Sequence, residues 1–396
     1  MQLSPRLERF AEPETLKMAK LGRELRSQGI DVIDLSLGEP DFDTPEHIKK
    51  AAVKAVEENW SHYPPVAGYP ELREAVCYKL KRDNSLDYKP ENIVVSTGAK
   101  QSLANAVFAV IDKGDEVIIP TPYWVTYSEI VKLGDGDVKL VPTSIENDYK
   151  LTPDQLEAAI TPKSKLFIFS SPSNPTGGVY SKAELEGLVK VFRKHPQIFI
   201  ISDEIYEYIN YVGKHESIAQ FDDIKDRVII INGLSKGFAM TGYRLGFIAA
   251  HAAVAKACEK LQGQITSGAT AVTQRAAITA LKSPLDATLD MLKEFTRRKK
   301  RIIELLNAIP GVRLSEPDGA FYVFPDISAY FGKKAGSETI SNADDLCMYL
   351  LNTAHVSTVT GRAFGEPNCI RISFANSMEK IEGGLKRITD AMASLK

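Results

Sequence analysis

The stretch RVIIINGLSKGFAMTGYRLGFIAA, residues 227–250, decides the fold of this chain. It contains two apolar runs, Val228–Ile231 and Leu245–Ala250, and each is bounded by residues that favour turns. Short apolar runs between turn signals are typical of strands that are buried on both faces. Lys236 follows the first run, between a serine and a glycine. A lysine that is desolvated beside a second cation such as Arg244 has a lowered pKa and becomes a usable nucleophile, whereas most lysines after a strand are solvated.

The same alternation of apolar strand and helix extends upstream of this stretch. Further apolar runs lie at residues 93–96, 116–119, 166–169 and 198–202. Strands of this kind that alternate with helices predict an α/β fold with a mainly parallel sheet covered on both faces. Five polar or unusual residues each follow an apolar run by a few positions: Gly98, Trp124, Asn174, Asp203 and Lys236. Because ligands bind beyond the carboxyl ends of such strands, we expect a site at that edge of the sheet.

The length of 396 residues exceeds that of a usual single core, so we expect two domains. After about residue 290 the pattern changes to amphipathic helices and short mixed strands, such as 321–324 and 369–373. We therefore predict an N-terminal arm that is part of a small domain (1–45), a large domain (46–290) and a C-terminal small domain (291–396).

Composition and charge argue against nucleic acids, metal ions and membranes as binding partners. The net charge is −2, and the basic run 297–301 lies among apolar residues at helical spacing, so we expect a solvated helix face and no nucleic acid. The four cysteines are far apart, without metal-ligand spacing, so we expect no metal site. No apolar run is long enough to cross a bilayer and no leader segment is visible, which favours a cytoplasmic enzyme without a membrane partner.

The segment Ser235–Gly246 resembles the Schiff-base lysine segment of class I aminotransferases, which are fold-type I enzymes that use pyridoxal 5′-phosphate (PLP). The resemblance extends from Thr15 to Arg371, with every motif in the expected order, and is greatest to the bacterial aspartate aminotransferase subgroup. It implies a three-layer α/β/α large domain, a smaller α+β domain, and a homodimer with shared active sites.

The resemblance assigns the cofactor's anchor and its phosphate site. Lys236 would carry PLP, and Ser235 and Arg244 would bind its phosphate. Tyr63 would reach the same phosphate from the neighbouring subunit. Gly98, Ala99 and Lys100 would contribute at a strand-to-helix junction. Free N–H groups at such a junction bind phosphate, although small residues in these turns also serve packing alone.

The cofactor ring requires an acid beside its pyridine nitrogen. Asp203 and Glu204 are adjacent and must point to opposite sides of a strand, so only one of them faces the site. The resemblance selects Asp203, and it places Tyr206 and Asn174 at the cofactor's 3-oxygen and Trp124 on the ring. Asn174 and Trp124 would also border the substrate. Their motifs alone equally allow a turn asparagine and a half-buried core indole.

The residues expected to bind the substrate are also assigned from their chemistry and from the resemblance. Arg371 lies in a short apolar strand, and its guanidinium suits a carboxylate. The resemblance implies that Arg371 and the backbone N–H of Gly38 bind the substrate α-carboxylate. It further implies that Lys100 and Thr15 contact the substrate side chain, and that Ser267 contributes from a neighbouring subunit. A solvated Lys100 in the first turn of a helix is the alternative.

The resemblance implies transfer of an amino group from L-aspartate to 2-oxoglutarate, giving oxaloacetate and L-glutamate, with Lys236 as the proton-transferring base. Aminotransferases for prephenate or aromatic amino acids share this scaffold, as do PLP-dependent lyases and non-catalytic sensor domains. The sensor domains are fused to DNA-binding regions, and no such basic segment is visible in this chain.

Overall fold

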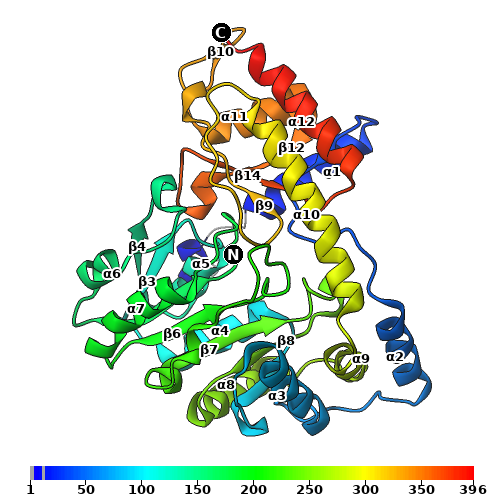
Figure 1. Ribbon diagram of the computed structural model, residues 1–396, viewed down its shortest axis with the longest axis vertical. Helices are drawn as coiled ribbons and strands as arrows, with labels where there is room; N and C mark the ends of the chain where they lie inside the picture. The colour runs from blue at the N-terminus through cyan, green and yellow to red at the C-terminus, as the bar shows by residue number, and fades with distance from the viewer. Residues whose placement is uncertain (1–3, 11–13) are drawn as a thin grey trace.

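A seven-stranded sheet forms the centre of the larger part of the molecule in a computed structural model, which describes residues 4–10 and 14–396 (Figure 1). The strand order is β2-β8-β7-β6-β5-β3-β4. These strands are β2 (Ile93–Ser96), β3 (Glu116–Thr121), β4 (Asp137–Pro142), β5 (Ser164–Ser170), β6 (Phe199–Asp203), β7 (Val228–Gly233) and β8 (Gly246–Ala249). Neighbouring strands of this sheet are parallel except around β8, which is antiparallel to β2 and β7. The predicted α/β fold is confirmed.

Two helical layers cover the sheet. One layer contains α2 (Glu46–Glu57), α3 (Pro70–Asn84), α6 (Pro153–Ala159), α7 (Lys182–Lys194) and α9 (Ala271–Lys282), and the other contains α4 (Ala99–Val110), α5 (Thr126–Leu133) and α8 (Ala252–Ile265). Successive residues of a strand point to opposite faces. In β7, Ile230 therefore packs with the first layer and Ile231 with the second. The apolar runs are continuous because both faces of these strands are buried.

The edge strand β4 does not occur among the predicted strands. Val141 is the one buried residue of this strand, and its neighbour Leu140 is 43% exposed. An edge strand of this kind lacks the continuous apolar run by which the buried strands can be recognised.

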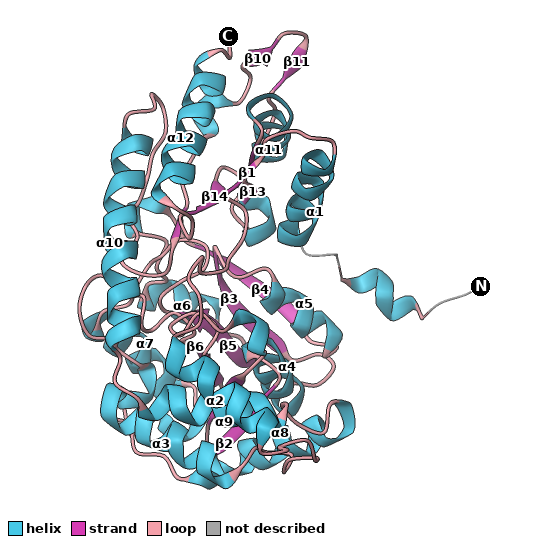
Figure 2. Cartoon of the chain, turned by 90° about the vertical axis from the view of Figure 1, so that its right-hand side faces the viewer, coloured by secondary structure: helices cyan, strands magenta, loops and turns pink. Residues whose placement is uncertain are grey.

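The smaller part of the molecule combines both ends of the chain (Figures 1 and 2). Its helices are α1 (Glu14–Ser27), α10 (Asp286–Asn307), α11 (Ala343–Tyr349) and α12 (Met378–Ala393), and its strands are β1 (Ile33–Asp34), β9 (Tyr322–Val323), β10 (Lys334–Ala335), β11 (Glu338–Thr339), β12 (Val356–Ser357), β13 (Val359–Thr360) and β14 (Ile370–Ser373). Strand β1 pairs in parallel with β12, which joins the N-terminal segment to the C-terminal one. The predicted boundaries after residues 45 and 290 stay a prediction, and α10 runs across the second.

Candidate active site

A cavity of about 320 Å³ lies at the carboxyl edge of the sheet, at the lower end of the size range of small-molecule sites. The sheet domain lines it with Ala99, Lys100, Trp124, Val125, Thr126, Tyr127, Ser170, Asn174, Asp203, Ile205, Tyr206, Ser235, Lys236, Thr241 and Arg244. The remaining lining residues are Ser36, Leu37, Gly38, Glu39, Tyr322 and Arg371. Asp203 ends β6 and Ser170 ends β5, so the cavity occupies the position where parallel sheets bind ligands.

Most of the residues predicted for the site line this one cavity. They are Gly38, Ala99, Lys100, Trp124, Asn174, Asp203, Tyr206, Ser235, Lys236, Arg244 and Arg371. Gly98 lies just outside the lining, as the N-cap residue of α4. Thr15 lies in α1, but its side chain falls outside the described part of the chain. Tyr63 and Ser267 line a different surface hollow, formed by residues 60–64 and 266–272.

Lys236 lies shortly after the end of β7, with its amine at the cavity. The Nζ atom donates a hydrogen bond to the carbonyl oxygen of Gly38 at 2.5 Å. Burial lowers the pKa of Lys236 from the ordinary 10.5 to about 8, and the positive charges of Arg371 and Arg244 also lower it. Above about pH 8 the amine is therefore mostly neutral, which is the form that acts as a nucleophile or base.

Asp203 faces the cavity from the last position of β6. Its Oδ2 accepts a hydrogen bond from the Tyr127 hydroxyl at 2.7 Å, and its Oδ1 accepts one from the Ile205 N–H at 3.2 Å. Burial raises the pKa of this carboxyl to about 6, and the charge of Glu204 also raises it. A buried acid of this kind fits a cationic partner, because a protonated ring nitrogen would stabilise its charged form.

The start of α4 fits the phosphate of PLP. Its N-cap, Gly98, has a φ of +83°, and no side chain caps the N-terminal N–H groups of the helix. A Cβ atom on Gly98 would lie 2.6 Å from Nη2 of Arg244, so only glycine lets this guanidinium approach the helix start. Ser235 lines the same cavity. Free N–H groups, the helix dipole and a guanidinium together suit a phosphate dianion.

Arg371 is 2% exposed, and no carboxylate among the described residues forms an ion pair with it. Its Nη1 donates to Oδ1 of Asn174 at 3.0 Å, and its Nη2 donates to the carbonyl oxygen of Ser36 at 2.6 Å. Its Nε is buried without a hydrogen-bond partner. A buried guanidinium with an unused donor at the wall of a cavity fits an incoming carboxylate.

Two tyrosines that line the cavity, Tyr322 and Tyr127, were not predicted from the sequence. The hydroxyl groups of Tyr206 and Tyr322 are 2.7 Å apart, and the guanidinium carbon of Arg371 lies 4.5 Å from the centre of the Tyr322 ring. A Cβ atom on Gly38 would lie 2.3 Å from the Tyr322 hydroxyl, so a side chain at that position would displace it. Tyr127, the hydrogen-bond donor to Asp203, is the second. Its ring packs against that of Trp124, a residue that was predicted for the site.

At the rim of the cavity, Lys100 is exposed and lies close to Trp124. The Lys100 Nζ is 5.0 Å from the centre of the Trp124 ring, within the range of a cation–π contact. Neither lysine of the cavity, Lys100 or Lys236, forms an ion pair with a carboxylate of the described chain. Lys100 and Arg371 therefore give the cavity two cations that remain available to an acidic ligand.

Comparison with known proteins identifies the family. Residues 30–388 match the model of "Aminotransferase class I and II". The chain is 45% identical to a bifunctional aspartate aminotransferase and glutamate/aspartate-prephenate aminotransferase of Petunia hybrida, over 100% of this chain and 84% of that protein. The crystal structure of the aspartate aminotransferase from Rhizobium meliloti superimposes with a TM-score of 0.97, at 39% identity and with 100% of both chains covered. That of Thermus thermophilus with maleate gives a TM-score of 0.93, at 37% identity, over 99% of this chain and 100% of the other.

These relatives span the whole chain, including both the sheet domain and the segments that carry Gly38 and Arg371. Aminotransferases of this type use PLP, and the residues around the cavity fit that cofactor at its phosphate, its ring nitrogen and its point of attachment. The chain belongs to the class I and II aminotransferases, as a PLP-dependent enzyme of fold type I.

Proposed function

We propose that this aminotransferase moves the amino group of L-aspartate to 2-oxoglutarate, giving oxaloacetate and L-glutamate. The observation that carries the proposal is the pair of cations in the cavity, Arg371 and Lys100, neither of which is paired with a carboxylate of the described residues. All four compounds are dicarboxylates, so one cation can bind each carboxylate. Relatives are named for aspartate, and the Thermus thermophilus structure contains maleate, another dicarboxylate.

The residues around the cavity divide the work of this reaction. PLP, when bound, supplies an electron-withdrawing ring that stabilises the charge left by removal of the substrate α-proton. Asp203 would keep a proton on the ring nitrogen, and Arg371 would orient the substrate through its α-carboxylate. The neutral amine of Lys236 would accept the proton from the substrate α-carbon and later give it up, as general base and then acid.

Two further residues act on the cofactor's 3-oxygen. The amide of Asn174 and the hydroxyl of Tyr206 would donate hydrogen bonds to it when the cofactor is bound. The Tyr206 hydroxyl is held by Tyr322 at 2.7 Å, and Asn174 is held by Arg371 at 3.0 Å. The two residues proposed to contact the cofactor are therefore held by other residues of the cavity, and one of these, Arg371, is the residue proposed to bind the substrate.

Prephenate is a second candidate substrate. Relatives from Nitrosomonas europaea and Cereibacter sphaeroides are named aspartate/prephenate aminotransferases. Prephenate also has two carboxylates, so the same two cations suit it. The proposal for aspartate and the candidate prephenate differ in the volume that the cavity must accept beside Trp124.

A steady-state panel of amino donors with Lys100→Ala tests the proposal. We expect kcat/KM for aspartate to fall about tenfold to a hundredfold, because a charge-assisted hydrogen bond to the distal carboxylate is lost. The value for phenylalanine, which has no distal carboxylate, should stay within about threefold. The control Lys100→Arg retains a cation and should keep most of the preference for aspartate. Equal losses for both donors would make Lys100 a surface lysine.

We also propose a homodimer with shared sites. Tyr63 is 95% exposed, and it lies in a surface hollow away from the cavity of its own chain. Ile265, next to the residues that form this hollow, and Val53 and Val56 on α2 are exposed as well. Exposed apolar side chains of this number support an interface with a second copy, which would place Tyr63 at the partner's phosphate site.

Mixed dimers test this arrangement. A Lys236→Ala chain and a Tyr63→Ala chain, each impaired alone, should together regain about a quarter of the wild-type activity after unfolding and remixing. In the mixed dimer one of the two sites receives Lys236 from one chain and Tyr63 from the other. No gain above the sum of the separate chains would refute the shared site.

The cytoplasmic location stays a prediction. Among the described residues, no helix combines the length and the apolar character needed to span a lipid bilayer.

A further inference from the structure

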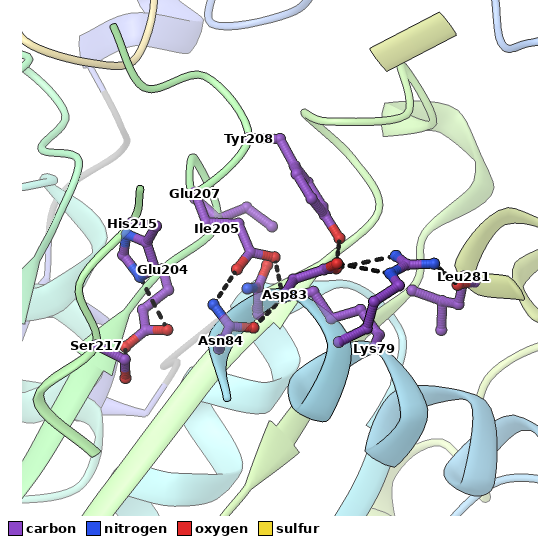
Figure 3. A network of polar contacts seen from close by, with 12 residues as sticks. Lys79, Asp83, Asn84, Glu204, Ile205, Glu207, Tyr208, His215, Ser217 and Leu281 are labelled. Carbon is purple, nitrogen blue, oxygen red and sulfur yellow. Dashed lines mark hydrogen bonds and ion pairs between the residues drawn. The ribbon is translucent and has the colours of Figure 1, made fainter. Parts of the chain in front are cut away.

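A buried polar cluster lies behind the active-site cavity and joins α3 to the segment that follows β6 (Figure 3). We call it the α3 network, and it consists of Lys79, Asn84, Glu204, Glu207, His215 and Ser217. All six side chains are buried. None of them lines the cavity, and the proposed reaction uses none of them.

The segment 203–207 has two faces. Asp203 and Tyr206 line the cavity, whereas Glu204 and Glu207 belong to the network on the other side. Backbone hydrogen bonds keep this segment compact, because the Glu207 N–H donates to the Glu204 carbonyl at 3.0 Å. A change in the position of Glu204 or Glu207 would therefore also change the position of its neighbour at the cavity, Asp203 or Tyr206.

Glu207 is fixed to α3 by charged and neutral partners. It forms an ion pair with the ammonium of Lys79, and its Oε2 accepts a hydrogen bond from the Asn84 Nδ2 at 2.9 Å. The Lys79 Nζ also donates to Oδ1 of Asn84 at 2.7 Å, which closes the triangle of the three side chains. The side chain of Lys79 is 1% exposed and that of Glu207 is 3% exposed, so water does not compete for these bonds.

Glu204 accepts hydrogen bonds at Oε1, and its Oε2 lies beside the imidazole of His215 without a hydrogen bond. The hydroxyls of Ser202 and Ser217 donate to Oε1 at 2.9 Å and 2.6 Å, and the His215 Nε2 lies 3.1 Å from Oε2. Burial, the largest single influence, lowers the pKa of His215, but contact with Glu204 and the charge of Glu207 together raise it above the ordinary value. Glu204, Glu207 and His215 have ligand atoms within 4.8 Å of one another, but the ammonium of Lys79 already supplies the positive charge that a metal ion would bring.

A second set of contacts connects α3 to the backbone beside Lys236. The hydroxyl of Tyr208 donates to Oδ2 of Asp83, near the end of α3, at 2.5 Å. The Tyr208 ring lies against Gly237, where a Cβ atom would be 2.5 Å from the ring carbon Cδ2. Gly237 directly follows Lys236, so α3 also supports the backbone from which the amine projects.

We propose that the α3 network is a positioning device that holds Asp203 and Tyr206 for the cofactor, an inference that rests on the proposed roles of these two residues. Buried ion pairs cost desolvation, and apolar residues of similar volume would join α3 to the sheet at least as firmly. Buried charges restrict geometry, because only a few arrangements of their partners offset the cost of removing them from water. The network therefore contributes less to folding stability than apolar residues would, but it fixes the orientation of the segment 203–207.

The double variant Lys79→Met/Glu207→Leu separates positioning from stability. Each single variant leaves one buried charge without a partner and should lower the Tm of the cofactor-free protein markedly. The double variant should recover most of that Tm, yet its Kd for PLP, titrated by absorbance on the cofactor-free protein, should remain about tenfold or more above wild type. The control Leu188→Ala, in the apolar core of α7, should lower Tm while leaving the Kd unchanged.

A wild-type Kd in the double variant would overturn the proposal, because the charges would then serve only to hold the fold. Should the double variant fail to fold, Ser202→Ala and Ser217→Ala each remove a hydrogen bond to Glu204 without removing a charged side chain from the network. Both should raise the Kd for PLP about threefold or more, and wild-type values in both would equally overturn it. Wild-type protein that binds no PLP would refute the proposed function, whereas equal binding by all proteins would refute the positioning role alone.

Discussion

Replacing Lys236 by alanine should lower the rate of the half-reaction with aspartate on the order of 10⁴-fold, the upper range for loss of a general base. The amine is both the expected point of covalent attachment for PLP and the group placed to move the α-proton. Its lowered pKa of about 8 supplies the neutral form that both tasks require. Stopped-flow absorbance after mixing the PLP-loaded protein with aspartate measures this rate directly.

Borohydride reduction provides the matching structural test. In the wild type it should fix the cofactor on the peptide that contains Lys236, and in Lys236→Ala no lysine should be labelled. Lys100→Ala is the matched control, because it removes the other lysine that lines the cavity and should leave the label on Lys236. Label on another lysine of the alanine variant would reassign the attachment point.

The positions of Lys236 and Asp203 could be predicted because Lys236 follows a buried strand and Asp203 ends one. Continuous apolar runs identify such strands, and the geometry of parallel sheets brings their carboxyl ends to one edge. The prediction that Asp203 and Glu204 face opposite sides also follows from the two-residue period of a strand. Asp203 lines the cavity, and Glu204 lies behind it with His215 and Ser217.

The partners of these residues could not be predicted in the same way. Tyr322 lies in the two-residue strand β9, and nothing in its local pattern indicates that its hydroxyl meets that of Tyr206. The burial of Lys79 could not be predicted either, because a charged residue at this position of α3 is typical of an exposed helix face. Its burial arises only when α3 packs against the segment that contains Glu207. Contacts between distant segments depend on tertiary packing, which local periodicity does not encode.

Arg371 raises a different question, because the structure buries its charge without an anion. Burial lowers the pKa of Arg371, and Tyr322 and Phe364 lie on its guanidinium at 4.5 Å and 4.9 Å. A guanidinium in this environment is held in one orientation, and its unpaired Nε leaves a donor for a ligand. We therefore expect a large part of the affinity for the substrate α-carboxylate to come from this one side chain.

Arg371→Met should raise KM about a hundredfold or more for every amino-acid substrate, because a buried charge pair with the α-carboxylate is lost. A shift common to aspartate and phenylalanine distinguishes Arg371 from Lys100, whose loss should affect aspartate alone. Arg371→Lys should not restore KM, because an ammonium cannot pair with a carboxylate through two parallel hydrogen bonds.

Ligand-induced stabilisation tests the same contact without turnover. Maleate at about a hundred times its Kd should stabilise the PLP-loaded wild type by about 2.7 kcal/mol, and the resulting rise in Tm should be absent in Arg371→Met. Lys100→Ala should retain part of the rise, because the carboxylate bound at Arg371 is still held. An unchanged rise in Tm in Arg371→Met would mean that the α-carboxylate binds elsewhere in the cavity. The unpaired Nε of Arg371 would then only destabilise the fold.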